Sequence, residues 1–244
     1  MRAADCSAVN TATTSRSDTS SAAFLQLVSG RRGHFRLESG HHGALWLDLD
    51  PLFADHDAVA PFVDALVDRL RPYGVAAICG PLQGGAFLAQ RCAAAIGGGA
   101  EFWFTERQLP GDAPGLFRVR YALPPALAQR AGGTRVAIVD DVMSAGSALR
   151  GTYTELTAHG ADVVAAGALM VLGTTGADYF AQQQVPVEHV CREMYELWTP
   201  LECPLCASGS PLEDVIGSAL NQLVKARPSD FSLPLELHER IESG

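Results

Sequence analysis

The sequence predicts an α/β protein in which a mainly parallel sheet is flanked by helices on both faces. Short apolar runs of strand length alternate along the chain with helix-like segments, as is typical of parallel strands joined by crossover helices. The composition, with 48% hydrophobic and 18% charged residues, is that of a globular protein. A chain of 244 residues is also long enough to bury roughly 70–75% of the surface that its unfolded form exposes.

The N-terminal part is expected to contain a tail, a short helix and a hairpin. Residues 1–20 are rich in Ser, Thr and Ala and have no apolar core like that of a secretory signal, so we expect a disordered tail. A helix is expected to begin near Ser21 and to end at Gly30. Apolar residues then alternate with polar ones over 34–40 and 44–49, which predicts two strands joined by a turn.

The rest of the chain predicts the alternating core. Apolar residues from Val59 to Leu70 follow helical spacing, and Pro72 and Gly74 end that helix. Further strands are expected at 75–79, 101–105, 135–139, 163–172 and 186–191, and further helices at 87–96, 147–158 and 177–184.

Two segments do not fit this alternation. Residues 106–125 contain four prolines and two glycines and are expected to form a long loop with at most a short extended piece. Residues 200–244 form a C-terminal extension, and the sequence does not predict how it packs. The expected organisation is therefore a tail (1–20), one α/β domain (21–199) and the extension.

The charge balance excludes several classes of partner. There are 18 basic and 27 acidic residues, giving a net charge of -9, which argues against binding to nucleic acid or to anionic membranes. No apolar stretch approaches the roughly 18–20 residues of a membrane span, and sparse cysteine usage favours a cytoplasmic protein with reduced thiols. Of the basic residues, 17 are arginine and only Lys225 is lysine.

The most informative segment lies at the end of one expected strand. Four apolar residues are followed by Asp140 and Asp141 and then by small residues that lead into a helix. The carboxyl ends of parallel strands are where ligands bind, and backbone N–H groups at a helix N-terminus bind phosphate. Adjacent carboxylates accept hydrogen bonds from a vicinal diol or bind a divalent cation. The simpler interpretation is a strand that ends in solvated acids before a serine-capped helix, but the full pattern favours a ligand site.

This segment, IVDDVMSAGSA, resembles the 5-phosphoribosyl 1-pyrophosphate (PRPP) motif of the type I phosphoribosyltransferases. The resemblance implies that Asp140 and Asp141 hold the ribose 2- and 3-hydroxyls, with Mg²⁺ bound near them or through water. It also implies that the 5-phosphate is held by the small residues that follow, namely Ser144, Ala145, Gly146, Ser147 and Ala148.

A second segment is similar to the same family. Residues 79–86 (CGPLQGGA) follow an expected strand and open a helix, with glycines that permit close approach of an anion. They resemble the family's pyrophosphate loop, although glycine-rich turns of this kind also occur for structural reasons alone. The resemblance implies that Gln83, Gly84 and Gly85 contact pyrophosphate.

The hairpin narrows the resemblance. Residues 33–40 (GHFRLESG), followed by Trp46-Leu47-Asp48, resemble the opening hairpin of orotate phosphoribosyltransferases. Over about residues 22–185 the resemblance implies a type I phosphoribosyltransferase fold with an N-terminal hairpin hood. It also implies a homodimer and base contacts from Phe35, Glu38 and Ser144.

The chain departs from that family where the family uses lysine. Glu38 and Gln83 stand where orotate enzymes usually have lysine, and the segment 105–123, which resembles their mobile catalytic loop, contains no lysine. Its arginines, Arg107, Arg118 and Arg120, are expected to close over pyrophosphate as catalytic residues. Arginine neutralises pyrophosphate well but is a poor proton donor.

These observations leave two functional interpretations. The first is transfer of ribose 5-phosphate from PRPP to a nucleobase, with Mg²⁺ and release of pyrophosphate. Glu38 should disfavour an anionic base such as orotate, so orotate and a different base both stay open. The second is a PRPP- or nucleotide-binding regulator that has lost catalysis.

Cys203 and Cys206 have the spacing of half a structural zinc site. Such a site needs four ligands, and the alternatives for the missing ones are Cys191, His189 or a second cysteine pair from the other subunit of a dimer. A reduced turn without metal is the favoured alternative. The histidines at the expected hairpin turn, His41 and His42, have two interpretations. They contact substrate or the other subunit of a dimer, or they are exposed turn residues with a structural role, which is the favoured interpretation.

Overall fold

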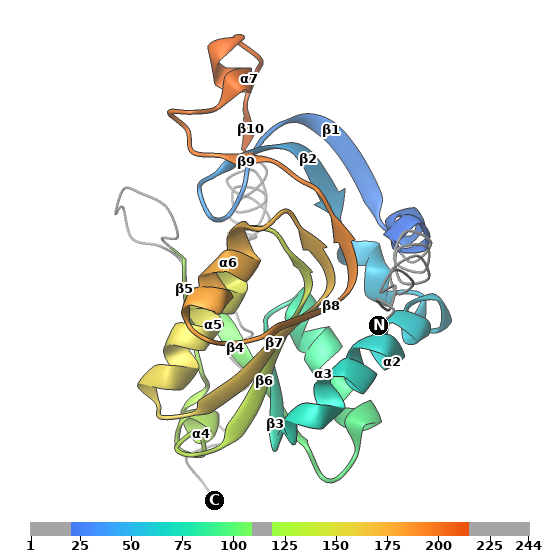
Figure 1. Cartoon of the computed structure of the whole chain (residues 1–244), viewed down its shortest axis with the longest axis vertical. Coiled ribbons are helices and arrows are strands. Elements are labelled where there is room, and N and C mark those ends of the chain that lie inside the picture. The colour runs from blue at the N-terminus through green and yellow to red at the C-terminus, as the bar shows by residue number, and fades with distance from the viewer. Residues whose placement is uncertain (1–20, 109–118, 215–244) are drawn as a thin grey trace, which may run out of the picture.

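The computed structural model describes residues 21–108 and 119–214, arranged around two sheets (Figure 1). The larger sheet has six strands in the order β5-β4-β3-β6-β7-β8. Its strands are β3 (Ala77–Pro81), β4 (Glu101–Gln108), β5 (Arg120–Ala122), β6 (Arg135–Met143), β7 (Asp162–Leu172) and β8 (Val187–Glu193). All neighbouring pairs are parallel except β4 and β5, which confirms the predicted mainly parallel sheet.

Helices cover both faces of this sheet, as expected. One face packs against α2 (His56–Leu70) and α3 (Gly84–Ile96), and the other against α5 (Ser147–Ala158) and α6 (Thr175–Gln182). Alternate residues of β6 enter the two cores, Val136 and Ile138 on the α5 side and Ala137 and Val139 on the α2 side. A strand buried on both faces has to be apolar throughout, which explains the continuous apolar runs in the sequence.

The first long helix shows how local sequence sets its limits. Asp55 caps α2 by accepting hydrogen bonds from the backbone N–H groups of Asp57 (3.1 Å) and Ala58 (3.0 Å). The predicted apolar face is buried. The chain then leaves the helix through the 3-10 turn η2 (Arg71–Tyr73) and Gly74, whose φ of 58° suits glycine.

The smaller sheet forms a hood above the larger one in the view of Figure 1. β1 (Ser29–Arg36) and β2 (His42–Asp48) form the predicted antiparallel hairpin. The C-terminal segment completes the hood, because β9 (Leu197–Trp198) pairs with β2, and β10 (Glu213–Asp214) pairs with β1. Residues 200–214 thus pack on the hairpin, a relationship that the sequence did not predict.

Strand β1 begins at Ser29 rather than at the expected residue 34. Its early part is polar, so apolar alternation does not mark it. Arg31 of this part lies over the ring of Phe35 in the same strand at 5.3 Å and pairs with Glu213 of β10 at 2.8 Å.

The segment expected to be a loop from residue 106 is in part a ribbon. β4 continues to Gln108, and β5 pairs back on it with Arg107 opposite Tyr121. Tyr121 is buried against α5, so tertiary packing orders a stretch that glycine and proline content alone marks as irregular. The short helices η1 (Asp50–Phe53), α4 (Pro125–Ala128) and α7 (Pro204–Ala207) complete the elements whose bounds the structure defines.

Several expectations fall outside the described residues. They are the N-terminal tail, Arg118 and the end of the C-terminal extension. In the part of the chain that the structure describes, no helix combines the length and the apolar character needed to cross a bilayer.

Candidate functional site

The two predicted aspartates lie at the carboxyl end of β6. The backbone N–H of Asp141 donates to Asp140 Oδ1 at 3.1 Å, and that of Val142 donates to Asp141 Oδ1 at 2.7 Å. Burial raises the pKa of the Asp140 carboxyl, and the neighbouring Asp141 raises it further. Two acids crowded in this way favour a ligand that donates hydrogen bonds or positive charge.

The predicted pyrophosphate loop lies directly against these acids. Gly84 and Gly85 follow the cis peptide between Leu82 and Gln83 and open α3. A Cβ on Gly84 would lie 2.0 Å from Asp141 Oδ2, and one on Gly85 would lie 2.8 Å from Asp140 Oδ1. Only glycine allows this approach, so two segments about 55 residues apart in sequence meet at one place.

The predicted phosphate loop forms the turn into α5. Gly146 caps the helix with a left-handed φ of 73°, and no side chain satisfies the first backbone N–H groups. Gly176 donates its backbone N–H to the carbonyl of Ser144 at 3.0 Å, which holds the turn in place. The small residues therefore leave a helix N-terminus beside the two acids, an arrangement suited to a phosphate.

Glu38, in the turn of the hood hairpin, contacts three of these elements. Its Oε1 accepts hydrogen bonds from the hydroxyls of Tyr121 (2.8 Å) and Ser147 (3.1 Å). Its Oε2 lies 3.3 Å from Nε of Arg107. Burial and the neighbouring Glu38 both raise the pKa of Tyr121, so this phenol stays a donor. The charge of Glu38 is thus paired within the protein.

The arginines expected to act on pyrophosphate are placed differently from one another. Arg107, at the end of β4, is held by Glu38. Arg120 begins β5 and lines a pocket beside α5. Among the described residues, neither arginine forms a hydrogen bond or an ion pair with the Gly84–Gly85 loop.

This pocket has a volume of about 530 Å³ and contains a second arginine, Arg150. Its guanidinium lies 4.2 Å from the ring centre of Tyr179, and its Nη2 donates to the carbonyl of Thr175 at 2.9 Å. Burial lowers the pKa of Arg150, although arginine stays protonated at neutral pH. Arg150 was not among the predicted site residues, although its position three residues after Ser147 puts both on one face of α5.

Two of the expected base contacts lie near this site, and the third does not reach the surface. Glu38 is in the hairpin turn, and Ser144 is in the phosphate turn. Phe35 is only 2% exposed, packed over Gly33 and under Arg31. Its ring fills the hood and is not available for stacking on a base.

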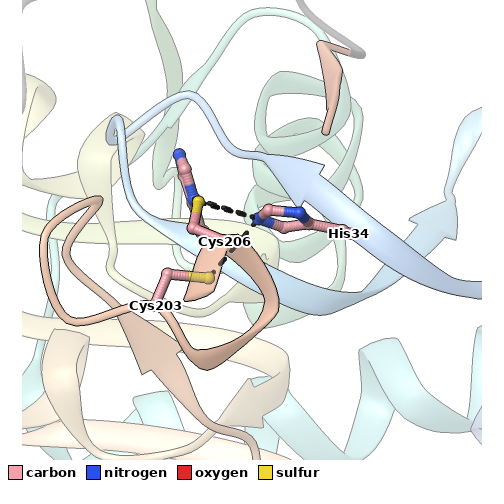
Figure 2. Close-up of side chains that lie close together, drawn as sticks. His34, Cys203 and Cys206 are labelled. Carbon is pink, nitrogen blue, oxygen red and sulfur yellow. Dashed lines mark hydrogen bonds between the residues drawn. The ribbon is translucent and has the colours of Figure 1, made fainter. Parts of the chain in front are cut away.

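The cysteine pair lies in the hood, away from the acids. Cys203 and Cys206 lie beside His34 (Figure 2) and beside His42. Of the alternatives weighed for completing a zinc site, Cys191 and His189 are not part of this group, whose two other members are His34 and His42. His42 and its neighbour His41 are buried, although the sequence placed them in an exposed turn.

Comparison with known proteins finds relatives named as phosphoribosyltransferases. No family model matches the chain. Orotate phosphoribosyltransferase from Caldanaerobacter subterraneus is 26% identical over 189 residues, covering 78% of this chain and 91% of the relative. The enzyme of the same name from Thermotoga maritima is 28% identical over 183 residues, covering 74% of this chain and 88% of the relative.

Solved structures show the same architecture. Orotate phosphoribosyltransferase from Aeropyrum pernix superimposes with a TM-score of 0.51 at 22% identity, over 68% of this chain and 88% of that one. Adenine phosphoribosyltransferase from Trypanosoma brucei superimposes with a TM-score of 0.52 at 16% identity, over 70% and 78% of the two chains. This is the fold of the type I phosphoribosyltransferases.

The type I phosphoribosyltransferase fold accounts for the sheet and the helices that cover it. The Asp140–Asp141 pair lies near the carboxyl end of β6, against the Gly84–Gly85 turn and just before the turn into α5. The contacts of Glu38 and the cluster around Cys203 could be found only from the structure.

Proposed function

We propose that this protein transfers ribose 5-phosphate from PRPP to a nucleobase and releases pyrophosphate. The observation that carries the proposal is the convergence of the Gly84–Gly85 loop on Asp140 and Asp141, beside the N-terminus of α5. Relatives named orotate phosphoribosyltransferase and the shared fold support it.

Each element has a role that follows from its chemistry. Asp140 and Asp141 would accept hydrogen bonds from the ribose hydroxyls, and the turn from Ser144 to Ala148 would hold the 5-phosphate through backbone N–H groups. The loop from Gln83 to Gly85 would bind pyrophosphate. Fixing both anionic ends of PRPP orients its anomeric carbon toward the base, and the nearby carboxylates favour the positive charge that develops on the ribose.

The acidic pair also fits Mg²⁺. Carboxylate oxygens are the protein ligands that this ion prefers, and it usually keeps several waters. Asp140 and Asp141 would hold it directly or through water, since their crowding raises the pKa of Asp140 and so favours a cation. A bound Mg²⁺ would neutralise charge on the departing pyrophosphate.

Orotate is the first base to test. The negative charge of Glu38 is offset by Arg107, which weakens the objection that Glu38 repels an anionic base. Arg150 brings a half-buried positive charge to the pocket beside Ser147. A cation fixed on an aromatic ring suits a planar base that carries a carboxylate.

The experiment is release of pyrophosphate from PRPP and Mg²⁺ with orotate, uracil, adenine and other bases in turn. Turnover with one base identifies the acceptor. The double variant Asp140→Asn, Asp141→Asn should lose PRPP binding while it stays folded, and unchanged affinity would remove the ribose assignment. PRPP binding without turnover on any base would instead assign the protein to the nucleotide-binding regulators.

A further inference from the structure

Four potential metal ligands from three parts of the chain meet in the hood (Figure 2). His34 is on β1, His42 begins β2, Cys203 is the N-cap of α7, and Cys206 lies within that helix. One ligand atom from each lies within 4.8 Å of all the others. Because His34 and His42 are on paired strands, the hairpin brings them side by side, and the C-terminal segment adds the cysteines.

The distances agree with a tetrahedral site. His34 Nε2 is 3.1 Å from His42 Nδ1, 3.4 Å from Cys203 Sγ and 3.6 Å from Cys206 Sγ, and Cys206 Sγ is 3.3 Å from His42 Nδ1. Zinc bonds of about 2.0–2.1 Å to nitrogen and 2.3 Å to sulfur place tetrahedral ligand atoms about 3.4 Å (N to N) and 3.6 Å (N to S) apart. The four observed separations are within a few tenths of an ångström of these values.

The surroundings also prepare His34 to bind a metal. Its Nδ1 lies 3.0 Å from the carbonyl of Ser210, which can only accept, so Nδ1 carries the proton and Nε2 directs its lone pair toward the cysteines. An outer hydrogen bond of this kind is typical of metal-bound histidines. His34, His42 and Cys203 are all 5% exposed or less, and two thiolates would cancel the charge of a divalent ion at this buried place.

We propose that His34, His42, Cys203 and Cys206 bind one structural zinc ion. Two thiolates and two imidazoles favour zinc over Mg²⁺ or Ca²⁺, which prefer oxygen ligands. Four protein ligands leave no open position for substrate, so the site is structural rather than catalytic. Binding releases the thiol protons.

The ion would hold the hood together. β9 and β10, which attach the C-terminal segment to the hairpin, have only two residues each. A zinc ion would cross-link both hairpin strands to this segment. His34 and His42 also flank the turn that carries Glu38, so the ion would fix the position of Glu38 over Ser147. The metal site does not depend on the proposed reaction.

The test is metal analysis of the full chain, purified under reducing conditions without a metal-affinity tag or chelator. We expect about one zinc ion per chain. His42→Asn and Cys206→Ser should each lower zinc affinity by more than the roughly 10–100-fold cost of removing an outer-shell partner. The matched controls, His41→Asn and Cys92→Ser, change a buried neighbour and a buried core thiol and should keep the ion.

A second measurement uses the wild-type protein and therefore tests the proposal even if the variants fail to fold. Wild-type protein stripped with a chelator should unfold at a lower temperature and recover with zinc, and Co²⁺ in its place should show thiolate charge-transfer absorption. Wild-type protein that binds no zinc when it is supplied, a His42→Asn variant that keeps full affinity, or a Cys203–Cys206 disulfide under reducing conditions would each overturn the proposal.

Discussion

Glu38 in the hood accepts a 3.1 Å hydrogen bond from the hydroxyl of Ser147, which lies 109 residues further along the chain at the start of α5. The same carboxylate binds Tyr121 and pairs with Arg107. One acidic side chain therefore connects the hood, the ribbon of β4 and β5, and the turn assigned to the phosphate.

Replacing Glu38 with Gln should remove the ion pair with Arg107 and keep much of the hydrogen bonding. We expect the free energy of unfolding to fall by about 1 kcal/mol, because the pair is only partly buried. The KM for orotate should fall about threefold to tenfold, since one nearby negative charge is lost and Arg107 is released. Steady-state kinetics and denaturant unfolding measure both effects. Glu106→Gln, an exposed change on the same ribbon, should alter neither, and an unchanged KM in Glu38→Gln would show that its charge is not felt at the base.

Replacing Asp140 with Asn should stabilise the protein at neutral pH and abolish PRPP binding. The folded state raises the pKa of Asp140 through burial and the charge of Asp141, so ionising this group costs folding energy. Asn keeps the acceptor for the backbone N–H of Asp141 and removes the charge. Each 1 kcal/mol gained should raise Tm by about 2–4 °C. Asp64→Asn, an exposed change on α2, should leave Tm nearly unchanged, whereas a destabilised Asp140→Asn would contradict the argument.

The pH dependence follows from the same pKa shift. A carboxyl whose pKa is raised on folding favours the folded state at low pH, and this contribution is lost as pH rises from the unfolded pKa to the folded pKa. The stability gain of Asp140→Asn over wild type should therefore be full above the folded pKa and shrink as pH falls through it. Thermal unfolding of both proteins across pH 4–8, a range that extends upward from the ordinary Asp pKa of about 3.9, tests this. A gain that is constant with pH would rule out Asp140 as its source.

Gly84→Ala should lower PRPP affinity by at least about tenfold. The new Cβ would lie 2.0 Å from Asp141 Oδ2, so the loop or the carboxylate must move, at an overpacking cost of about 1–3 kcal/mol. Gly132→Ala is the matched control, because its nearest heavy atom would be 3.9 Å away. Isothermal titration with PRPP compares them. Equal affinities would mean that the contact of Gly84 with Asp141 does not shape the PRPP site.

Arg150→Gln should raise the KM for an anionic base by about 10–100-fold and change the KM for PRPP much less. A hydrogen bond to a charged group contributes about 1.5–3 kcal/mol, and Arg150 is the half-buried cation of the pocket beside α5. Arg130→Gln removes an exposed arginine and should have little effect. If Arg150→Gln weakened PRPP and base equally, Arg150 would belong to the phosphate site.

Local sequence was sufficient to predict much of the fold. Burial on both faces requires continuous apolar strands, and the helical spacing from Val59 to Leu70 reflects a helix with one buried side. The pair Asp140–Asp141 and the small residues after it were also visible, because a strand, a tight turn and a helix start follow one another within a few residues. These strands, the helix and the Asp140–Asp141 segment could be predicted because each is determined by residues close together in the sequence.

Contacts between segments far apart in sequence were determined by the tertiary structure alone. The partners of Glu38 come from β4, β5 and α5, and Cys203 meets His34 across 169 residues. No local sequence pattern predicts such a pair, because each side chain could form the same contact with other partners until the hood folds. The sequence showed that lysine is absent from the segments expected to bind anions. Only the tertiary structure showed where Arg107, Arg120 and Arg150 lie and that Glu38 is paired with Arg107. The sequence determines which chemical group each residue carries, but the packing of the two sheets determines which partner that group meets and therefore its role.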